Sequence, residues 1–203
     1  MKLIGMLDSP FVRRVAISAK RLGIELEQHS VSVFRTFEQF QQINPVVKAP
    51  TLVLDDGEVL MDSTLIIDYL ESLAGPDRSL MPTATEQRLR ALRLIGLALA
   101  ACEKSVQLYY ERNLRPTEIQ FAPWVERVEG QLAAAYNALE RELEKQPLNT
   151  DGPIDQAGIT LAVAWSFTNL VVPDQVSSAK FPKIAAFTEY AEGLEVFIST
   201  PVD

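Results

Sequence analysis

The first third of the chain carries short apolar runs, whereas the rest repeats its apolar residues at spacings of three and four. Short apolar runs predict strands, and apolar residues repeated at spacings of three and four predict helices. The expected strands are Lys2–Met6, Leu26–Val33, Thr51–Asp55 and Val59–Met61. The expected helices are Phe11–Leu22, Arg35–Gln42 and Asp62–Ala74. A helix between the first two strands implies parallel pairing through a right-handed crossover, so this part predicts a small α/β unit.

The hairpin between the third and fourth expected strands has the strongest local signals. Asp56-Gly57 separates its two apolar runs and predicts a tight turn, because glycine adopts positive φ at little cost. Pro50 stands at the first residue of a strand, where its missing N–H does no harm. If the bond before Pro50 is cis, the peptide group of Ala49 turns outward and can pair with an extended peptide.

The helix after the hairpin begins at Asp62-Ser63. A helix N-terminus presents unpaired N–H groups and partial positive charge, so it attracts a carboxylate. The free backbone edges of the hairpin and this N-terminus converge at one place. An alternative is an ordinary hairpin and helix in which Asp62 or Ser63 is only the N-cap.

Beyond residue 75 the strand signals end. Residues 75–82 are rich in proline and glycine and predict a linker. The helical patterns that follow are Thr85–Asn113, Phe121–Lys145, Asp155–Leu170 and Phe181–Leu194. Asp155 is expected to cap the third of these, with Ile154 and Ile159 as a hydrophobic staple. That helix is apolar on nearly every side, which predicts the centre of an all-helical bundle.

Composition limits the function classes. The chain of 203 residues has 19 basic and 27 acidic side chains, a net charge of −8, which argues against nucleic-acid binding. We expect no membrane span and no signal peptide. The single cysteine, Cys102, and single histidine, His29, exclude an internal disulfide and a Cys or His metal cluster, and they suit a reducing cytoplasm. The charge runs Arg88–Arg93 and Glu140–Lys145 are interpreted as solvated faces and subunit contacts.

Several motifs in a fixed order resemble the glutathione S-transferases, and most closely the bacterial members with serine at the catalytic turn. They are Ser9-Pro10-Phe11 after the first strand, NPVVKAP at 44–50, Asp62-Ser63 after the fourth strand, and FPKIAAF at 181–187. The resemblance implies a thioredoxin-like α/β N-terminal domain at 1–76, a linker at 77–84 and an all-α helical domain at 85–203. It also implies a two-fold homodimer.

The resemblance assigns roles to individual residues. Ser9 is expected to be catalytic, because its hydroxyl can hydrogen-bond a bound thiolate; without cysteine in this turn, dithiol exchange is ruled out. An alternative makes Ser9 only an N-cap. The residues expected to bind glutathione are Phe11, Lys48, Ala49, Pro50, Asp62 and Ser63. Candidates for an electrophile pocket in the helical domain are Tyr109, Tyr110 and Arg112; no metal or cofactor is expected.

The expected activity is a glutathione transferase that ionises the thiol of glutathione and adds the thiolate to a small electrophile, or reduces a peroxide or disulfide. The rival hypotheses are a non-catalytic protein-interaction module on the same fold and a carrier of apolar ligands. His29 is interpreted as a packed or surface residue and Cys102 as a small core residue. The chain departs from the family at Gly158, where an aspartate usually completes the capping box of the core helix.

Overall fold

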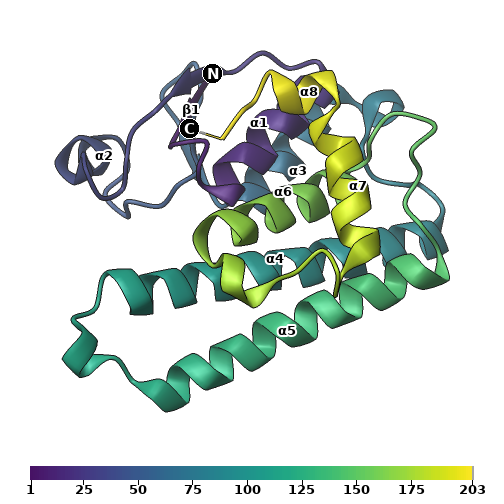
Figure 1. Cartoon of the computed structure of the whole chain (residues 1–203). Helices are drawn as coiled ribbons and strands as arrows, with labels where there is room; N and C mark the ends of the chain where they lie inside the picture. The colour runs from purple at the N-terminus through teal and green to yellow at the C-terminus, as the bar shows by residue number, and fades with distance from the viewer. Residues whose placement is uncertain (203) are drawn as a thin grey trace. The chain divides into compact units, whose positions relative to one another are not determined.

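The computed structural model describes residues 1–202 (Figure 1). By its internal contacts the chain forms two compact units. The first contains Met1–Leu80 together with the C-terminal segment from Leu194, and the second is Met81–Gly193. The C-terminal segment thus packs with the α/β unit, whereas the sequence prediction places it in the range of the helical domain.

The first unit is built on a four-stranded mixed sheet with strand order β2-β1-β3-β4. The strands are β1 (Lys2–Ile4), β2 (Glu27–His29), β3 (Thr51–Val53) and β4 (Val59–Met61). The expected parallel pairing of β1 with β2 is confirmed, and β1–β3 and β3–β4 are antiparallel.

Three of the four predicted strands are shorter than expected: β3 ends at Val53 instead of Asp55, and β1 and β2 also end early. β1 ends before Gly5, whose φ of 138° lies outside the range of a strand. β2 ends at His29 because the N–H of Val31 turns back to the His29 carbonyl at 3.0 Å. The apolar residues beyond these points led to the longer predictions, because an apolar pattern does not show where the extended backbone of a strand ends.

The helices of this unit are α1 (Pro10–Leu22), α2 (Phe37–Ile43), α3 (Ser63–Ala74), α8 (Glu195–Ile198) and the short 3₁₀ segment η1 (Pro76–Arg78). α1 contacts both α3 and α8. Gly23 ends α1 in the left-handed conformation, φ 70°, with its N–H bonded back into the helix. Phe40 of α2 is fully buried in a cluster with Ile4 and Val31.

The second unit is helical throughout its regular part. It contains α4 (Thr85–Asn113), α5 (Ala122–Lys145), α6 (Gln156–Val171), α7 (Pro182–Glu192) and the 3₁₀ segments η2 (Thr117–Ile119) and η3 (Pro173–Gln175). α4 and α5 run side by side over their lengths (Figure 1). The expected central helix is α6, which is buried on nearly every side and contacts both α4 and α7. Tyr136, Trp165 and Phe181 form an aromatic cluster with ring centroids 5.3–5.9 Å apart.

The N-terminus of α6 explains the departure at Gly158. The carboxylate of Asp155 accepts the Gly158 N–H at 2.7 Å, so the expected cap is present. A β-carbon at Gly158 would lie 2.9 Å from side-chain atoms of both Ile154 and Phe187. Such a contact requires neighbouring side chains to move. Glycine therefore permits close packing at this position. A side chain that could make the second interaction of the capping box would not fit without movement of its neighbours.

The acidic run at the end of α5 is not uniformly solvated, contrary to the sequence interpretation. Glu140 is only 5% exposed. Its two carboxylate oxygens accept the N–H groups of Lys183 and Ile184 at 2.7 and 3.1 Å, at the start of α7. Glu142 pairs with Arg93 of α4 at 3.3 Å, so one arginine of the basic run is also engaged within the unit. These acidic residues join α5 to two neighbouring helices.

Candidate functional site

Ser9 lies at the N-cap position of α1, but its side chain makes no capping hydrogen bond. The Ser9 carbonyl accepts the N–H groups of Val12 and Arg13 at 3.1 and 2.9 Å, so the backbone alone starts the helix. Pro10 occupies the first helical turn, where it leaves no unpaired donor. The hydroxyl of Ser9 is half-buried and carries no structural duty as a cap, which leaves it available to a ligand. Phe11, the next residue of this turn, is also half-buried.

The loop before β3 is held by Asn44, whose role the sequence did not reveal. Asn44 is 3% exposed, and its amide donates to the Thr51 hydroxyl at 2.9 Å while its carbonyl oxygen accepts the Val46 N–H at 3.0 Å. The Thr51 hydroxyl in turn donates to the Lys48 carbonyl at 2.7 Å. These bonds fix the path of the loop on both sides of Lys48.

The peptide bond between Ala49 and Pro50 is cis, as the sequence analysis considered. No hydrogen bond joins the N–H or C=O of Ala49 to another described residue. This peptide group therefore presents an open donor and acceptor beside β3, the arrangement with which an extended peptide pairs.

Gly5 permits the approach of this loop to α1, and no motif in the sequence marks this glycine. A β-carbon on Gly5 would lie 2.6 Å from Val12 of α1 and 3.2 Å from the β-carbon of Ala49. A side chain at position 5 would therefore force apart the turn that carries Ser9 and the loop that carries Ala49. Its positive φ is a second reason for glycine.

Lys48 and Asp62 come together at the end of the hairpin. Because Thr51 pairs with Met61, the residues just before β3 and just after β4 follow at the same end of the sheet. The ammonium of Lys48 lies 3.7 Å from a carboxylate oxygen of Asp62. About half of each side chain is exposed, so the pair contributes little to stability and leaves both charges accessible.

Asp62 has a strained backbone, with φ 74° and ψ 123°. Its side chain caps α3 by accepting the Thr64 N–H at 2.9 Å, so the interpretation of Asp62 as an N-cap is confirmed. Capping does not exclude binding, because the second carboxylate oxygen faces Lys48. Positive φ outside glycine is costly and often marks a functional site.

Ser63, the first residue of α3, is buried and accepts a hydrogen bond from Arg14 of α1 at 2.9 Å. Arg14 is itself 2% exposed, and none of the sequence motifs includes it. No local signal could have identified the contact, because the two residues are separated by 49 positions.

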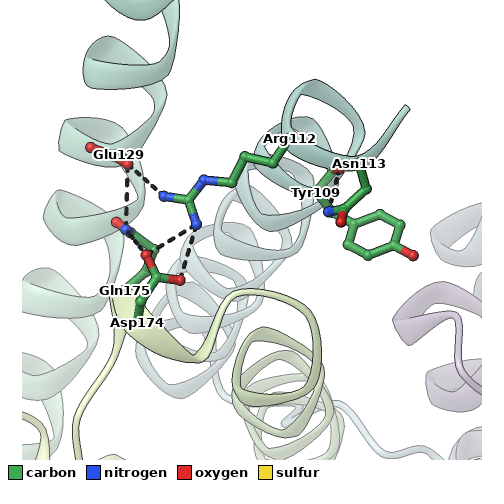
Figure 2. A network of polar contacts seen from close by, with 6 residues as sticks. All are labelled: Tyr109, Arg112, Asn113, Glu129, Asp174 and Gln175. Atoms are coloured by element: carbon green, nitrogen blue, oxygen red, sulfur yellow. Dashed lines mark hydrogen bonds and ion pairs between the residues drawn. The ribbon is translucent and has the colours of Figure 1, made fainter. Parts of the chain in front are cut away.

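The three candidates for an electrophile pocket lie on the C-terminal half of α4, in the second unit. Arg112 reaches across to two carboxylates (Figure 2): it donates to both oxygens of Asp174 at 3.0 Å and to Glu129 at 2.7 Å. Hydrogen bonding to Asp174 raises the pKa of Arg112. This network ties α4 to α5 and η3. The rings of Tyr109 and Tyr110 are tilted against each other at 6.3 Å, and Tyr110 is exposed.

An open groove of about 500 Å³ runs along α6 and α7. It is lined among others by Trp165, Ser166, Asn169, Pro182, Ala185 and Glu189. None of the candidates on α4 lines this groove, so the structure does not join it to the predicted electrophile pocket.

The described residues 1–202 contain no group of three or more His, Cys, Asp or Glu side chains arranged to hold a metal ion. They also contain no helix with the length and apolar character needed to cross a membrane.

The chain is similar to known proteins both in sequence and in fold. Residues 3–78 match the family model for the N-terminal domain of glutathione S-transferases. The protein YibF of Escherichia coli K12, described as uncharacterised and GST-like, is 29% identical over 83% of this chain and 82% of its own length. A glutathione transferase family member from Pseudomonas fluorescens Pf-5, solved with bound glutathione, is 28% identical; the match has a TM-score of 0.86 and covers 100% of this chain and 98% of that one. A glutathione S-transferase from Methylobacterium radiotolerans, 23% identical, has the same fold with a TM-score of 0.89, over 98% of this chain and 93% of that one.

Proposed function

We propose that this chain belongs to the glutathione S-transferase family, whose N-terminal domain model matches residues 3–78, and that it is a glutathione transferase with a serine-assisted thiol site. The first unit binds glutathione, and the bound thiolate attacks a small electrophile or reduces a peroxide or disulfide. The observation that carries the proposal is the set of open groups beside the end of the β3–β4 hairpin: the unpaired peptide of Ala49, the exposed charges of Lys48 and Asp62, and the N-terminus of α3.

The proposed contacts follow from the chemistry of the tripeptide. The cysteinyl backbone pairs with the N–H and C=O of Ala49 beside Pro50, as a strand pairs with an open edge. Lys48 binds a terminal carboxylate, and Asp62 binds the γ-glutamyl ammonium. Ser63 binds the γ-glutamyl carboxylate at the positive end of α3.

Ser9 is proposed to stabilise the thiolate. A free thiol has a pKa of about 8.5 and is mostly protonated at neutral pH. A hydrogen bond from the Ser9 hydroxyl to the sulfur, together with the positive N-terminus of α1, favours the anion and lowers this pKa. The thiol proton passes to solvent. The thiolate then forms a new bond to the electrophile, while a leaving group departs with its electron pair or a double bond of the electrophile takes up that pair and a proton from solvent. Holding both reactants replaces a bimolecular encounter, which supplies further acceleration.

Substitution of Ser9 tests this mechanism. In the Ser9→Ala variant we expect the pKa of bound glutathione to rise by about one unit, the loss of about 1.4 kcal/mol of thiolate stabilisation. The ultraviolet absorbance of the thiolate, followed against pH with glutathione at saturation, measures this pKa. The exposed Ser177→Ala variant in the other unit is the control. An unchanged thiolate titration in Ser9→Ala removes Ser9 from the mechanism, whatever the activity toward model aryl halides.

The rival function is a protein-interaction module without thiol chemistry. One simple binding experiment distinguishes it from a transferase. A transferase is retained on immobilised glutathione and eluted by free glutathione, whereas a module that has lost the site passes through. The exposed Lys48–Asp62 pair favours retention. Under the transferase proposal no cofactor is needed, glutathione is a co-substrate, and a reducing cytoplasm suits the single cysteine.

We also propose a two-fold homodimer. Both units expose leucines on helices: Leu65 and Leu73 on α3, and Leu89 and Leu92 on α4. A self-complementary interface would cover them. Sedimentation of the wild-type protein at micromolar concentration should give the mass of two chains, about 45 kDa for subunits of 22.6 kDa. A monomer under these conditions contradicts the dimer but leaves the glutathione site untouched.

A further inference from the structure

Arg14 places a buried positive charge next to the N-terminus of α3. It is among the largest fully buried side chains of the protein. One guanidinium nitrogen, Nη1, lies 2.9 Å from the Ser63 hydroxyl oxygen and 3.2 Å from the Thr64 hydroxyl oxygen. Both contacts stay inside the first unit and join α1, the helix that begins beside Ser9, to α3.

The direction of these hydrogen bonds is fixed by chemistry. A guanidinium has only donors, so in each contact the hydroxyl oxygen is the acceptor. The proton of the Ser63 hydroxyl therefore points away from Arg14. No described residue accepts this proton, and none accepts the backbone N–H of Ser63. Two donors of one buried residue are thus left for an acceptor from outside the chain.

We infer that Arg14 is a positioning residue that sets Ser63 to donate to a carboxylate of the ligand. The inference rests on the proposed glutathione site, where this acceptor is the γ-glutamyl carboxylate. Without Arg14 the Ser63 hydroxyl could rotate and act as an acceptor, and its preference for an anion over a neutral amide would weaken. Arg14 therefore determines selectivity for an anionic group at this end of the ligand, without touching the ligand itself.

The test compares glutathione with an analogue whose γ-glutamyl carboxylate is converted to a carboxamide. Isothermal titration calorimetry gives the two dissociation constants, and their ratio measures carboxylate selectivity. In Arg14→Lys and Arg14→Gln we expect glutathione to bind about tenfold more weakly, the scale of one charge-assisted hydrogen bond. The analogue should change less than about twofold, since it lacks the charge that the oriented hydroxyl recognises.

The neighbouring residue Arg13 supplies the matched control. Arg13 is equally buried at 3% exposure in the same helix, but it donates to the Thr200 carbonyl at 2.9 Å and lies over the Phe197 ring. Arg13→Lys should disturb packing as Arg14→Lys does, while leaving the selectivity ratio unchanged. Equal weakening of both ligands in the Arg14 variants means a structural role only and overturns the inference.

A double variant and a measurement on the wild type complete the experiment. Ser63→Ala should lose the same selectivity, and Arg14→Lys combined with Ser63→Ala should lose no more, because both changes break one interaction. If the double variant loses more selectivity than either single variant, the inference is contradicted. If no Arg14 variant folds, the guanidinium ¹⁵N resonances of Arg14 in the wild type decide: they should shift with glutathione and not with the analogue. Failure of the wild type to bind either ligand contradicts the proposed function instead.

Discussion

Replacement of Glu140 by alanine is expected to lower the free energy of unfolding of the helical unit by about 3 kcal/mol, the cost of breaking a buried charged network. The carboxylate is 5% exposed and accepts two N–H groups at the start of α7. These N–H groups belong to the four that a helix leaves unpaired at its N-terminus. Without the carboxylate they stay buried without an acceptor, and the favourable charge at the helix end is lost.

Urea unfolding followed by tryptophan fluorescence measures this effect selectively. The chain has two tryptophans, Trp124 and Trp165, and both lie in the helical unit. Glu140→Gln should cost less than Glu140→Ala, because the amide keeps one acceptor oxygen. Glu144→Ala, an exposed change one turn further along α5, should leave the unfolding midpoint unchanged. Equal midpoints for Glu140→Ala and Glu144→Ala would show that the buried carboxylate has no stabilising role.

Glu140 illustrates which part of the fold the sequence could not predict. Its neighbours in the chain form a run of charged residues, and such a run predicts a solvent-exposed helix face. The partners that bury it stand 43 and 44 positions away. The long helices α4, α5 and α6 were predicted because their apolar period repeats over many turns. Periodicity describes one element at a time, so it cannot find a side chain that caps another helix.

In the candidate site, too, residues in local motifs could be predicted from the sequence, whereas residues that act through contacts distant in the chain could not. Ser9, the Ala49–Pro50 bond and Asp62 lie in short local motifs, and the cis bond and the cap at Asp62 were both considered from the sequence. Gly5 and Arg14 act across the fold: one allows α1 to approach Ala49, and the other donates to Ser63. In the sequence, a glycine after a strand and an arginine in an amphipathic helix have ordinary explanations. The groups proposed to touch the ligand could therefore be predicted, and those that hold them in place could not.

Two substitutions of Asp62 separate its charge from its capping bond. Asp62→Asn keeps an oxygen that can accept the Thr64 N–H, so α3 should remain capped and stability should change little. The variant loses the negative charge proposed to bind the γ-glutamyl ammonium. We expect the dissociation constant for glutathione to rise about thirtyfold, equivalent to about 2 kcal/mol, the scale of a lost charge-assisted hydrogen bond.

Asp62→Ala should weaken glutathione binding to a similar extent and, in addition, destabilise the protein by about 1 kcal/mol through loss of the cap. Calorimetric titration measures the affinity, and thermal unfolding without ligand measures the stability. Glu58→Gln, an exposed change in the turn of the same hairpin, removes an equal charge and should leave glutathione affinity unaltered. Because the Lys48–Asp62 pair is half exposed, its loss adds little to either result. Wild-type affinity in both Asp62 variants would exclude Asp62 from the glutathione site, since one of them preserves the helix cap and neither preserves the charge.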